Sequence, residues 1–203
     1  MQERTNQNVA RGAATREHLI EVATKLFAER GYEDTSIENV LEEASVSRGS
    51  LYHHFKNKES LFEAVLEAIE NDVGLRVMEA AAAVTDPKAI LRSGALAWVQ
   101  LAGDPVVQRV LLIDAPAVLG WERWRALEER HALGLIRDVL GAIAEQGDLD
   151  AHLIDVFAHV ILASINEIAL LVARSDQPDR EAELSADAID EVLSRLLGAT
   201  DTS

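Results

Sequence analysis

Apolar residues recur every three or four positions along most of the chain, which places them on one face of an α-helix. The first such stripe lies within residues 13–30 and consists of Leu19, Ile20, Ala23, Leu26 and Phe27. Gly31 follows it directly, where a left-handed residue ends a helix at low cost. The polar residues 1–11 that precede the stripe are expected to form a loose tail.

Two short helices are predicted next, with only a tight turn between them. Thr35 and Glu38 have the spacing of a capping box and open the first helix, which extends to about Glu43. Ser47 is placed to cap the second helix, over residues 48–54, and Asn57 to cap the long helix that begins at Lys58. Two short helices joined in this way are typical of a helix-turn-helix, whose second helix enters the major groove of DNA.

The remaining pattern is helical to the end of the chain, with proline and glycine near the expected helix boundaries. It contains no convincing strand and no internal repeat, so we expect an all-α protein of about nine helices. Residues 1–60 are predicted to form a DNA-binding domain and residues 61–203 a second helical domain. The further helices are expected at residues 58–84, 87–102, 105–115, 121–146, 150–174 and 180–197.

Composition supports this interpretation and limits the cellular setting. Of 203 residues, 48% are apolar and only 4% aromatic, which suits a helical core rich in alanine and leucine. The chain has no cysteine, a polar N-terminus, and no uninterrupted apolar window near ~18 residues. We therefore expect a cytoplasmic protein with no signal peptide and no membrane span.

The charge is distributed unevenly along the chain. The net charge is −16, but residues 1–60 carry −2 of it and residues 61–203 carry −14. A DNA-binding module needs a locally basic face rather than a basic chain, so the overall acidity does not exclude DNA.

The second short helix has the composition of a recognition helix. Leu51 and Phe55 are spaced to face the core, which leaves the polar side chains outward. Arginine can bind guanine through two hydrogen bonds, hydroxyl groups can reach phosphates, and Gly49 permits a close approach of the backbone. The outward residues are Arg48, Ser50, Tyr52 and His53.

The run TSIENVLEEASVSRGSLYHHFKNKESL, residues 35–61, resembles the DNA-binding signature of the tetracycline-repressor (TetR) family. The usual Ala-Gly-Val-Ser turn has serine at position 45, which costs energy if a positive φ is needed, and Leu41 replaces a commonly small residue. The resemblance implies phosphate or base contacts by Thr35, Ser36, Ser47, Arg48, Gly49, Ser50, Tyr52, His53 and Lys58. Arg48, Gly49 and Ser50 would lie nearest the bases. A helical hairpin with polar faces is the alternative.

The same resemblance implies that the second domain binds a small molecule and dimerises, and residues 150–197 are the expected dimer pair of helices. Polar or aromatic groups within apolar helices are candidate ligand contacts. They are Trp98, Asp114, Trp121, Trp124, His131, His159 and Asn166. The tryptophans could equally fill the core, Asp114 could cap a helix, and Asp155 could pair with His159.

These features predict a repressor that a small, largely apolar molecule releases from a palindromic operator, with the helix over residues 58–84 as the lever. A cationic ligand is a competitor, since carboxylates and indole rings both suit cations. An adaptor or activator with the same fold remains open, as does a metal-responsive regulator using His131, Asp155 and His159. We expect no cofactor and no enzyme activity, because no nucleophile elbow, phosphate loop or H-E-x-x-H motif is present.

Overall fold

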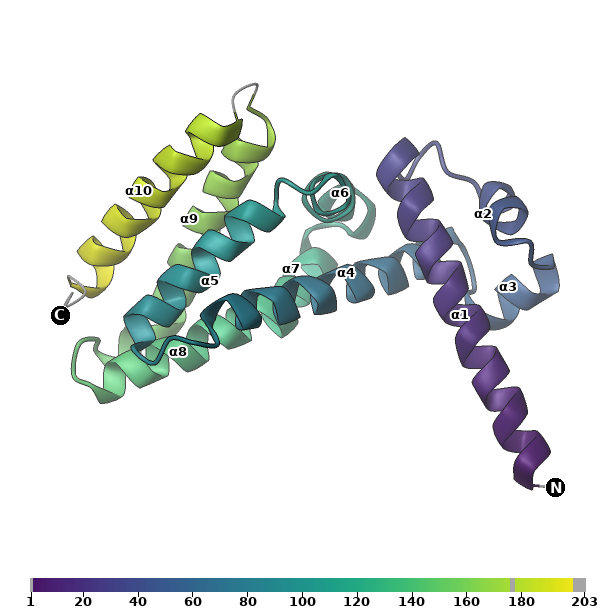
Figure 1. Ribbon diagram of the computed structural model, residues 1–203, viewed down its shortest axis with the longest axis horizontal. Helices are drawn as coiled ribbons and strands as arrows, with labels where there is room; N and C mark the ends of the chain where they lie inside the picture. Colours follow the sequence, from purple (N-terminus) through teal and green to yellow (C-terminus); the bar gives the residue numbers. More distant parts are fainter. Residues whose placement is uncertain (1, 176–177, 199–203) are drawn as a thin grey trace.

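The computed structural model describes residues 2–175 and 178–198, and within these ranges every regular element is a helix, which confirms the all-α fold. Helices α1, α2 and α3 gather at one end, and α4 leads from them to the other end, where α5, α8, α9 and α10 pack (Figure 1). The segments η1 and η2 are π-helical, and η3 is a 3-10 turn. In chain order the elements are α1 (Gln2–Arg30), α2 (Ile37–Ala44), α3 (Arg48–His54), α4 (Lys58–Ala81), α5 (Pro87–Leu101), η1 (Val107–Asp114), α6 (Ala115–Leu119), α7 (Trp121–Glu128), η2 (Glu129–Leu133), α8 (Gly134–Glu145), η3 (Ala151–Leu153), α9 (Ile154–Ala173) and α10 (Pro178–Leu197).

Helix α1 is longer than the sequence pattern indicates. Residues 1–11 were expected to be a loose tail, but the helix begins at Gln2; Met1 lies outside the described residues. The expectation was wrong because a nucleated helix extends at little cost through residues with good helix propensity. The segment before Gly12 contains two Gln, two Arg and one Glu and has no proline.

The start of α2 is displaced by one residue from the predicted capping box. Ser36 is the N-cap: its side chain accepts a hydrogen bond from the Asn39 N–H, and the Asn39 side chain accepts one from the Ser36 N–H. Thr35 cannot take this role, because its side chain is buried and its hydroxyl donates to backbone carbonyls. The predicted caps Ser47 and Asn57 are confirmed.

The first hydrophobic core joins α1, α2, α3 and the first half of α4. Phe27, Tyr32 and Phe62 form an aromatic cluster at its centre, with ring centroids 4.9 to 5.7 Å apart. Val107, Val110 and Leu111 of η1 belong to the same core. Apolar packing therefore continues from the helix-turn-helix into η1, beyond the predicted division at residue 60.

The second core is made by α5, α8, α9 and α10. A bidentate ion pair between Arg92 and Asp190 joins α5 to α10, and the Arg92 hydrogen bonds lower the pKa of Asp190. The single helix predicted over residues 121–146 is divided into α7, η2 and α8. Residues 116–120, expected as a break, contain the short helix α6, because Pro116 in its first turn needs no hydrogen-bond partner for its nitrogen.

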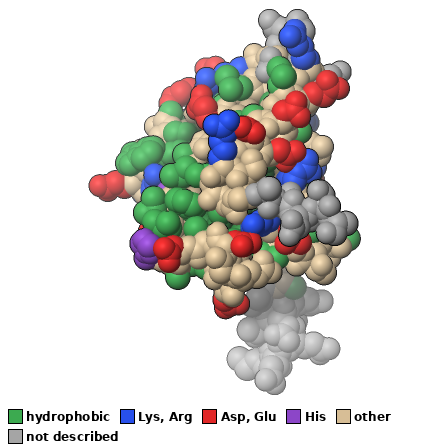
Figure 2. Space-filling model, turned by 90° about the vertical axis from the view of Figure 1, so that its left-hand side faces the viewer, with side chains coloured by type: hydrophobic (Ala, Val, Ile, Leu, Met, Phe, Trp, Pro, Cys, Tyr) green, Lys and Arg blue, Asp and Glu red, His purple; other side chains and the backbone are tan. Residues whose placement is uncertain are grey.

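One face of α9 is apolar yet lies outside both cores. Val156, Val160 and Leu171 are exposed by 57%, 42% and 59%, at spacings that put them on one side of the helix. The segment Ala151–Val172 has the length and hydropathy of a membrane span, and 28% of it is buried. The end of the molecule that carries α9 and α10 shows hydrophobic side chains gathered on one side (Figure 2). This exposed face is the surface available for a partner helix.

Candidate functional site: a nucleic-acid surface and an internal cavity

A left-handed residue makes the turn between α2 and α3. Ser45 has φ 53° and ψ 37°, and its N–H donates to the carbonyl of Glu42 at 3.3 Å. A left-handed conformation costs an L-residue about 1–2 kcal/mol relative to the right-handed helix, so the serine carries the strain that the sequence suggested. The strain is offset by the burial of Val40 and Ala44 on one side of the turn and Leu51 on the other.

Helix α3 presents a polar face to solvent. Leu51 and Phe55 are buried as predicted, whereas Arg48, Gly49, Tyr52 and His53 are exposed and Ser50 is half-buried. Ser47, itself exposed, caps the helix through the Ser50 N–H at 3.2 Å. The cap of α2, Ser36, is exposed at the N-terminus of the helix, and helix N-termini attract anions such as phosphates.

Arg48 is paired within this surface. Its guanidinium binds the Glu38 carboxylate of α2 and lies 6.0 Å from the centre of the Tyr52 ring. The hydrogen bond to Glu38 raises the pKa of Arg48. A hydrogen bond from its own backbone and the bond from Arg48 lower the pKa of Glu38. Both groups are charged at neutral pH, so the Glu38 carboxylate competes with any other acceptor for this guanidinium nitrogen.

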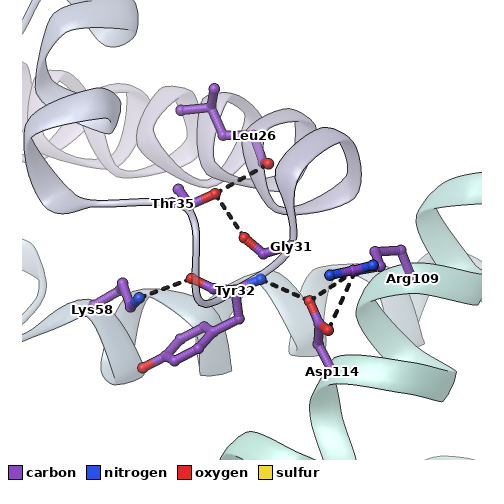
Figure 3. A network of polar contacts seen from close by, with 7 residues as sticks. All are labelled: Leu26, Gly31, Tyr32, Thr35, Lys58, Arg109 and Asp114. Atoms are coloured by element: carbon purple, nitrogen blue, oxygen red, sulfur yellow. Dashed lines mark hydrogen bonds and ion pairs between the residues drawn. The ribbon is translucent and has the colours of Figure 1, made fainter.

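Two residues expected at phosphates are engaged inside the protein (Figure 3). The Thr35 hydroxyl donates to the carbonyls of Leu26 at 3.2 Å and Gly31 at 2.8 Å, and the residue has no exposed surface. Lys58 donates from Nζ to the Tyr32 carbonyl at 2.8 Å, with the ammonium 4.0 Å from the centre of the Tyr32 ring. Both side chains hold the loop after α1 in place by hydrogen bonds. Because the hydroxyl proton of Thr35 is used in these bonds, it is not available to donate to a phosphate.

Asp114, a predicted ligand contact, lies outside the cavity described below and instead joins η1 to the loop after α1. Its carboxylate accepts a hydrogen bond from the Tyr32 N–H at 2.8 Å and forms an ion pair with Arg109, whose Nε lies 3.3 Å away (Figure 3). Asp114 is 9% exposed, whereas Arg109 remains largely open to water. The N–H and the carbonyl of Tyr32 are thus bound by η1 and by the start of α4, respectively.

A cavity of about 250 Å³ lies between α4, α5, η1, α7, η2, α8 and α9. Its wall is mostly leucine, isoleucine, valine and alanine, with a few polar groups. Four predicted ligand contacts line it: Trp98, Trp124, His131 and Asn166. A mostly apolar cavity with few polar groups is the usual form of a small-molecule site.

The other predicted ligand contacts are elsewhere. Trp121 is 64% exposed and packs against Trp124 and Arg125, with ring-to-ring and ring-to-guanidinium distances of 5.3 and 5.1 Å. His159 does not line the cavity, although its Nδ1 is buried without a hydrogen-bond partner. Trp121 is thus largely open to solvent and His159 is partly buried away from the cavity, and a ligand contact at either residue stays a prediction.

Glu70 is a cavity residue that the sequence analysis missed. It is 9% exposed and lies in the middle of α4, where it lines the cavity beside Val73 and Gly74. A signal was available, because Glu70 follows Leu66 by four positions and precedes Val73 by three, a spacing that places its carboxylate among the apolar residues of the helix.

The residues considered for a metal site are not gathered. Asp155 binds Arg137 at 2.7 Å, and His131 Nε2 lies 3.8 Å from the Glu67 carboxylate. Among residues 2–175 and 178–198, no three His, Cys, Asp or Glu side chains are grouped closely enough to hold a metal ion.

A helix-turn-helix joined to a larger helical domain with an internal cavity defines a class of helical regulatory protein, and the comparisons agree. The family description "Bacterial regulatory proteins, tetR family" matches residues 19–65, and "Tetracyclin repressor-like, C-terminal domain" matches residues 89–196. The second match covers more than half of the chain. The chain belongs to the TetR family.

Individual relatives give the same result. A TetR-family transcriptional regulator from Pectobacterium atrosepticum is similar in structure, with a TM-score of 0.77 and 30% identity over 93% of this chain and 96% of that one. The repressor KstR2 of Rhodococcus jostii is 36% identical over 78 residues, 38% of each chain. AibR, solved with isovaleryl coenzyme A and operator DNA, shares the fold, with a TM-score of 0.63 and 21% identity over 92% of this chain and all of that one. The alignments cover less than two fifths of the length of the first curated relatives.

Proposed function

We propose that this protein is a ligand-responsive transcriptional regulator of the cytoplasm. It acts as a repressor that a small, largely apolar molecule releases from a palindromic operator. Its family and the repressor KstR2 among its relatives support the regulatory role. The observation that carries the proposal is the polar, solvent-facing α3 beside a capped helix N-terminus, joined through α4 and η1 to an apolar cavity.

The DNA-binding unit is a homodimer formed through residues 150–197. Two copies of α3, related by a two-fold axis, read two half-sites of an operator. The exposed apolar face of α9 supports this assembly, since its side chains are the ones that a second α9–α10 pair would cover. On DNA, Arg48 and Ser50 lie nearest the bases, while Ser36, Ser47, Tyr52 and His53 lie along the backbone.

The signal passes between the two ends through η1 and α4. Leu111 and Leu112 line the cavity, and Asp114, two residues later in the same π-helical segment, binds the Tyr32 N–H. Helix α4 lines the cavity from Glu70 onward, and its first residue, Lys58, binds the Tyr32 carbonyl. A ligand that binds one arrangement of η1 and α4 better than another shifts the spacing of the two α3 helices.

Selection from a random duplex DNA library tests this function. The expected result is an inverted repeat, bound less tightly as salt rises. Six to ten phosphate contacts give a log–log slope of about −5 to −9, and the few basic residues favour the shallow end of that range. An adaptor that uses the same fold without DNA would enrich no sequence, and that outcome would refute the proposal.

A further inference from the structure

Two buried nitrogens of cavity-lining residues have no hydrogen-bond partner. They are Nε1 of Trp98 and Nε2 of His131. The Glu67 carboxylate lies 3.8 Å from His131 Nε2, which is too long for a hydrogen bond. Buried polar groups are almost always paired in native proteins. An unpaired nitrogen on a side chain that lines the cavity is therefore a candidate polar contact for a bound molecule.

The indole nitrogen determines whether one ligand group must donate or accept a hydrogen bond. Indole N–H is only a donor, so the group that meets Trp98 must be a hydrogen-bond acceptor. Imidazole donates or accepts according to its tautomer, so His131 can serve a second contact of either kind. A fully protonated amine has no lone pair and cannot satisfy Trp98.

The charge of the cavity argues against an anion. No Lys or Arg is among the described residues that line it, whereas Glu70 and Asp138 are. A carboxylate or phosphate placed there would lose its hydration without gaining a cation, which is a large penalty. A neutral ligand avoids this cost.

The size of the cavity suits a small ligand of one or two rings. Its volume of about 250 Å³ lies just below the range of roughly 300–1,000 Å³ that is usual for ligand pockets. Gly74 adds open space to the wall, because a Cβ at this position would meet no atom within 4 Å beyond its own turn of helix. A flat bicyclic compound matches these dimensions.

We propose that the cavity binds a neutral one- or two-ring compound with a hydrogen-bond acceptor, such as a carbonyl oxygen, that meets Trp98 Nε1. His131 Nε2 is the second polar contact, and the apolar walls from α4, α5 and α8 enclose the rings. This inference names the chemical class of the effector and rests on the proposed function for its regulatory meaning. The binding itself is a property of the cavity and is measurable without DNA.

A matched set of bicyclic compounds tests the class by calorimetry on the full chain. Tetralin has no polar group, 1-tetralone adds the carbonyl, 1-aminotetralin adds a cation, and tetralin-1-carboxylate adds an anion. We expect 1-tetralone to bind roughly tenfold more tightly than tetralin, the gain of one buried hydrogen bond, and the carboxylate to bind weakest. Tighter binding of the amine or of the carboxylate, or no binding of 1-tetralone, would overturn the proposal.

Two tryptophan variants locate the hydrogen bond. Trp98→Phe keeps an aromatic ring and removes the N–H, so it is expected to weaken 1-tetralone roughly tenfold and to leave tetralin nearly unchanged. Trp124→Phe is the matched control, since Trp124 also lines the cavity but its nitrogen is not among the unpaired ones. Equal losses for tetralin and 1-tetralone in Trp98→Phe would show that the ring packs and donates nothing, contrary to the proposal.

The outcomes separate this inference from the proposed function. If 1-tetralone binds as expected and DNA selection enriches no site, the cavity chemistry stands and the regulatory role fails. If an inverted repeat is enriched and the amine or carboxylate binds best, the regulatory role stands and the carbonyl proposal fails.

Discussion

The two ends of the molecule differ in how their buried polar groups are satisfied. In the loop after α1, the Thr35 hydroxyl, both backbone groups of Tyr32 and the Asp114 carboxylate are paired with one another or with the backbone. Among the described residues, the buried side-chain atoms without a partner are the nitrogens of Trp98, His131 and His159, all in the sensor half. The buried polar groups of the first end are therefore paired within the protein, whereas the second end leaves the nitrogens of Trp98 and His131 for the proposed ligand and that of His159 away from the cavity.

The exposed surfaces differ in the same way. Helix α3 offers polar groups to solvent, and α9 offers valine and leucine. A polar face suits the phosphates and base edges of DNA, and an apolar face suits a second copy of the chain. We therefore propose that the end with α3 recognises DNA and that the end with α9 binds the ligand and forms the dimer. Each of these assignments can be tested separately.

The largest expected effect follows from breaking the apolar face of α9. Val160→Asp combined with Leu171→Asp places two charges on the proposed dimer surface, so the protein should become monomeric in light scattering at micromolar concentration. Loss of the second half-site should weaken operator binding at least about 100-fold. Leu75→Asp on α4 is the control, because Leu75 is 57% exposed, as Leu171 is 59%. A double variant that stays dimeric would place the interface elsewhere.

The second-largest effect is expected at the proposed DNA-binding surface of α3. Arg48→Ala should lower discrimination between the operator and a scrambled site about 10- to 100-fold, since a bidentate base contact is lost. Glu38→Gln should tighten binding to both DNAs several-fold, because a carboxylate no longer competes for Arg48. Fluorescence anisotropy with both duplexes measures the two results. Equal losses on both duplexes for Arg48→Ala would mean that Arg48 binds phosphate only.

Lys58→Ala distinguishes a direct phosphate contact from a structural role of Lys58 in the loop after α1. The sequence alone predicts uniform weakening on all DNA sequences, as for a phosphate contact. Because Lys58 binds the Tyr32 carbonyl, we expect that weakening to come with a loss of stability of about 1–2 kcal/mol in urea unfolding. Weaker DNA binding with unchanged stability would show that Lys58 acts only as a phosphate contact.

An intermediate effect is expected at the connection between the two ends. Asp114→Ala leaves the Tyr32 N–H without its acceptor, which should cost about 1–3 kcal/mol of stability and reduce the effect of ligand on DNA affinity. Asp114→Asn retains an acceptor oxygen and should keep most of the coupling. Ligand affinity measured without DNA should be unchanged in both, because Asp114 does not line the cavity. Normal ligand release in Asp114→Ala would exclude η1 as the transmitter.

The smallest effects compare two left-handed residues. Gly31 has φ 82° and faces the Arg109 guanidinium, so Gly31→Ala should destabilise by about 1–2 kcal/mol. Ser45→Gly should stabilise by about 0.5–1 kcal/mol, since it removes the left-handed strain at a small cost in chain entropy. Urea unfolding measures both, and effects of the same sign would contradict the assignment of strain to Ser45.

Local features were predictable because neighbouring residues determine them. The caps Ser47 and Asn57 and the buried Leu51 and Phe55 follow from spacing within one or two helical turns. The strained serine at position 45 follows from the resemblance of this turn to the family signature. The cap at α2 was displaced by one residue, because the burial of Thr35 depends on carbonyls of α1 and the loop that follows it.

Long-range features could be predicted only in part. Sequence gives the face of a helix but not which neighbour covers it, so Trp98 and Asn166 were found at the cavity while Trp121 proved to be exposed. Asp114 was recognised as unusual within apolar sequence, but its partner Tyr32 lies 82 residues away. Helical periodicity carries no information about such a pairing.

The coupling between the cavity and the DNA surface is the central claim, and one linkage measurement tests it most directly. Calorimetry would give the affinity of 1-tetralone for the free protein and for the protein saturated with its selected operator. Coupling is reciprocal, so operator DNA should weaken 1-tetralone binding by the same factor, about 5- to 150-fold, by which 1-tetralone weakens operator binding. Equal affinity of 1-tetralone for the free and the DNA-bound protein would contradict the account.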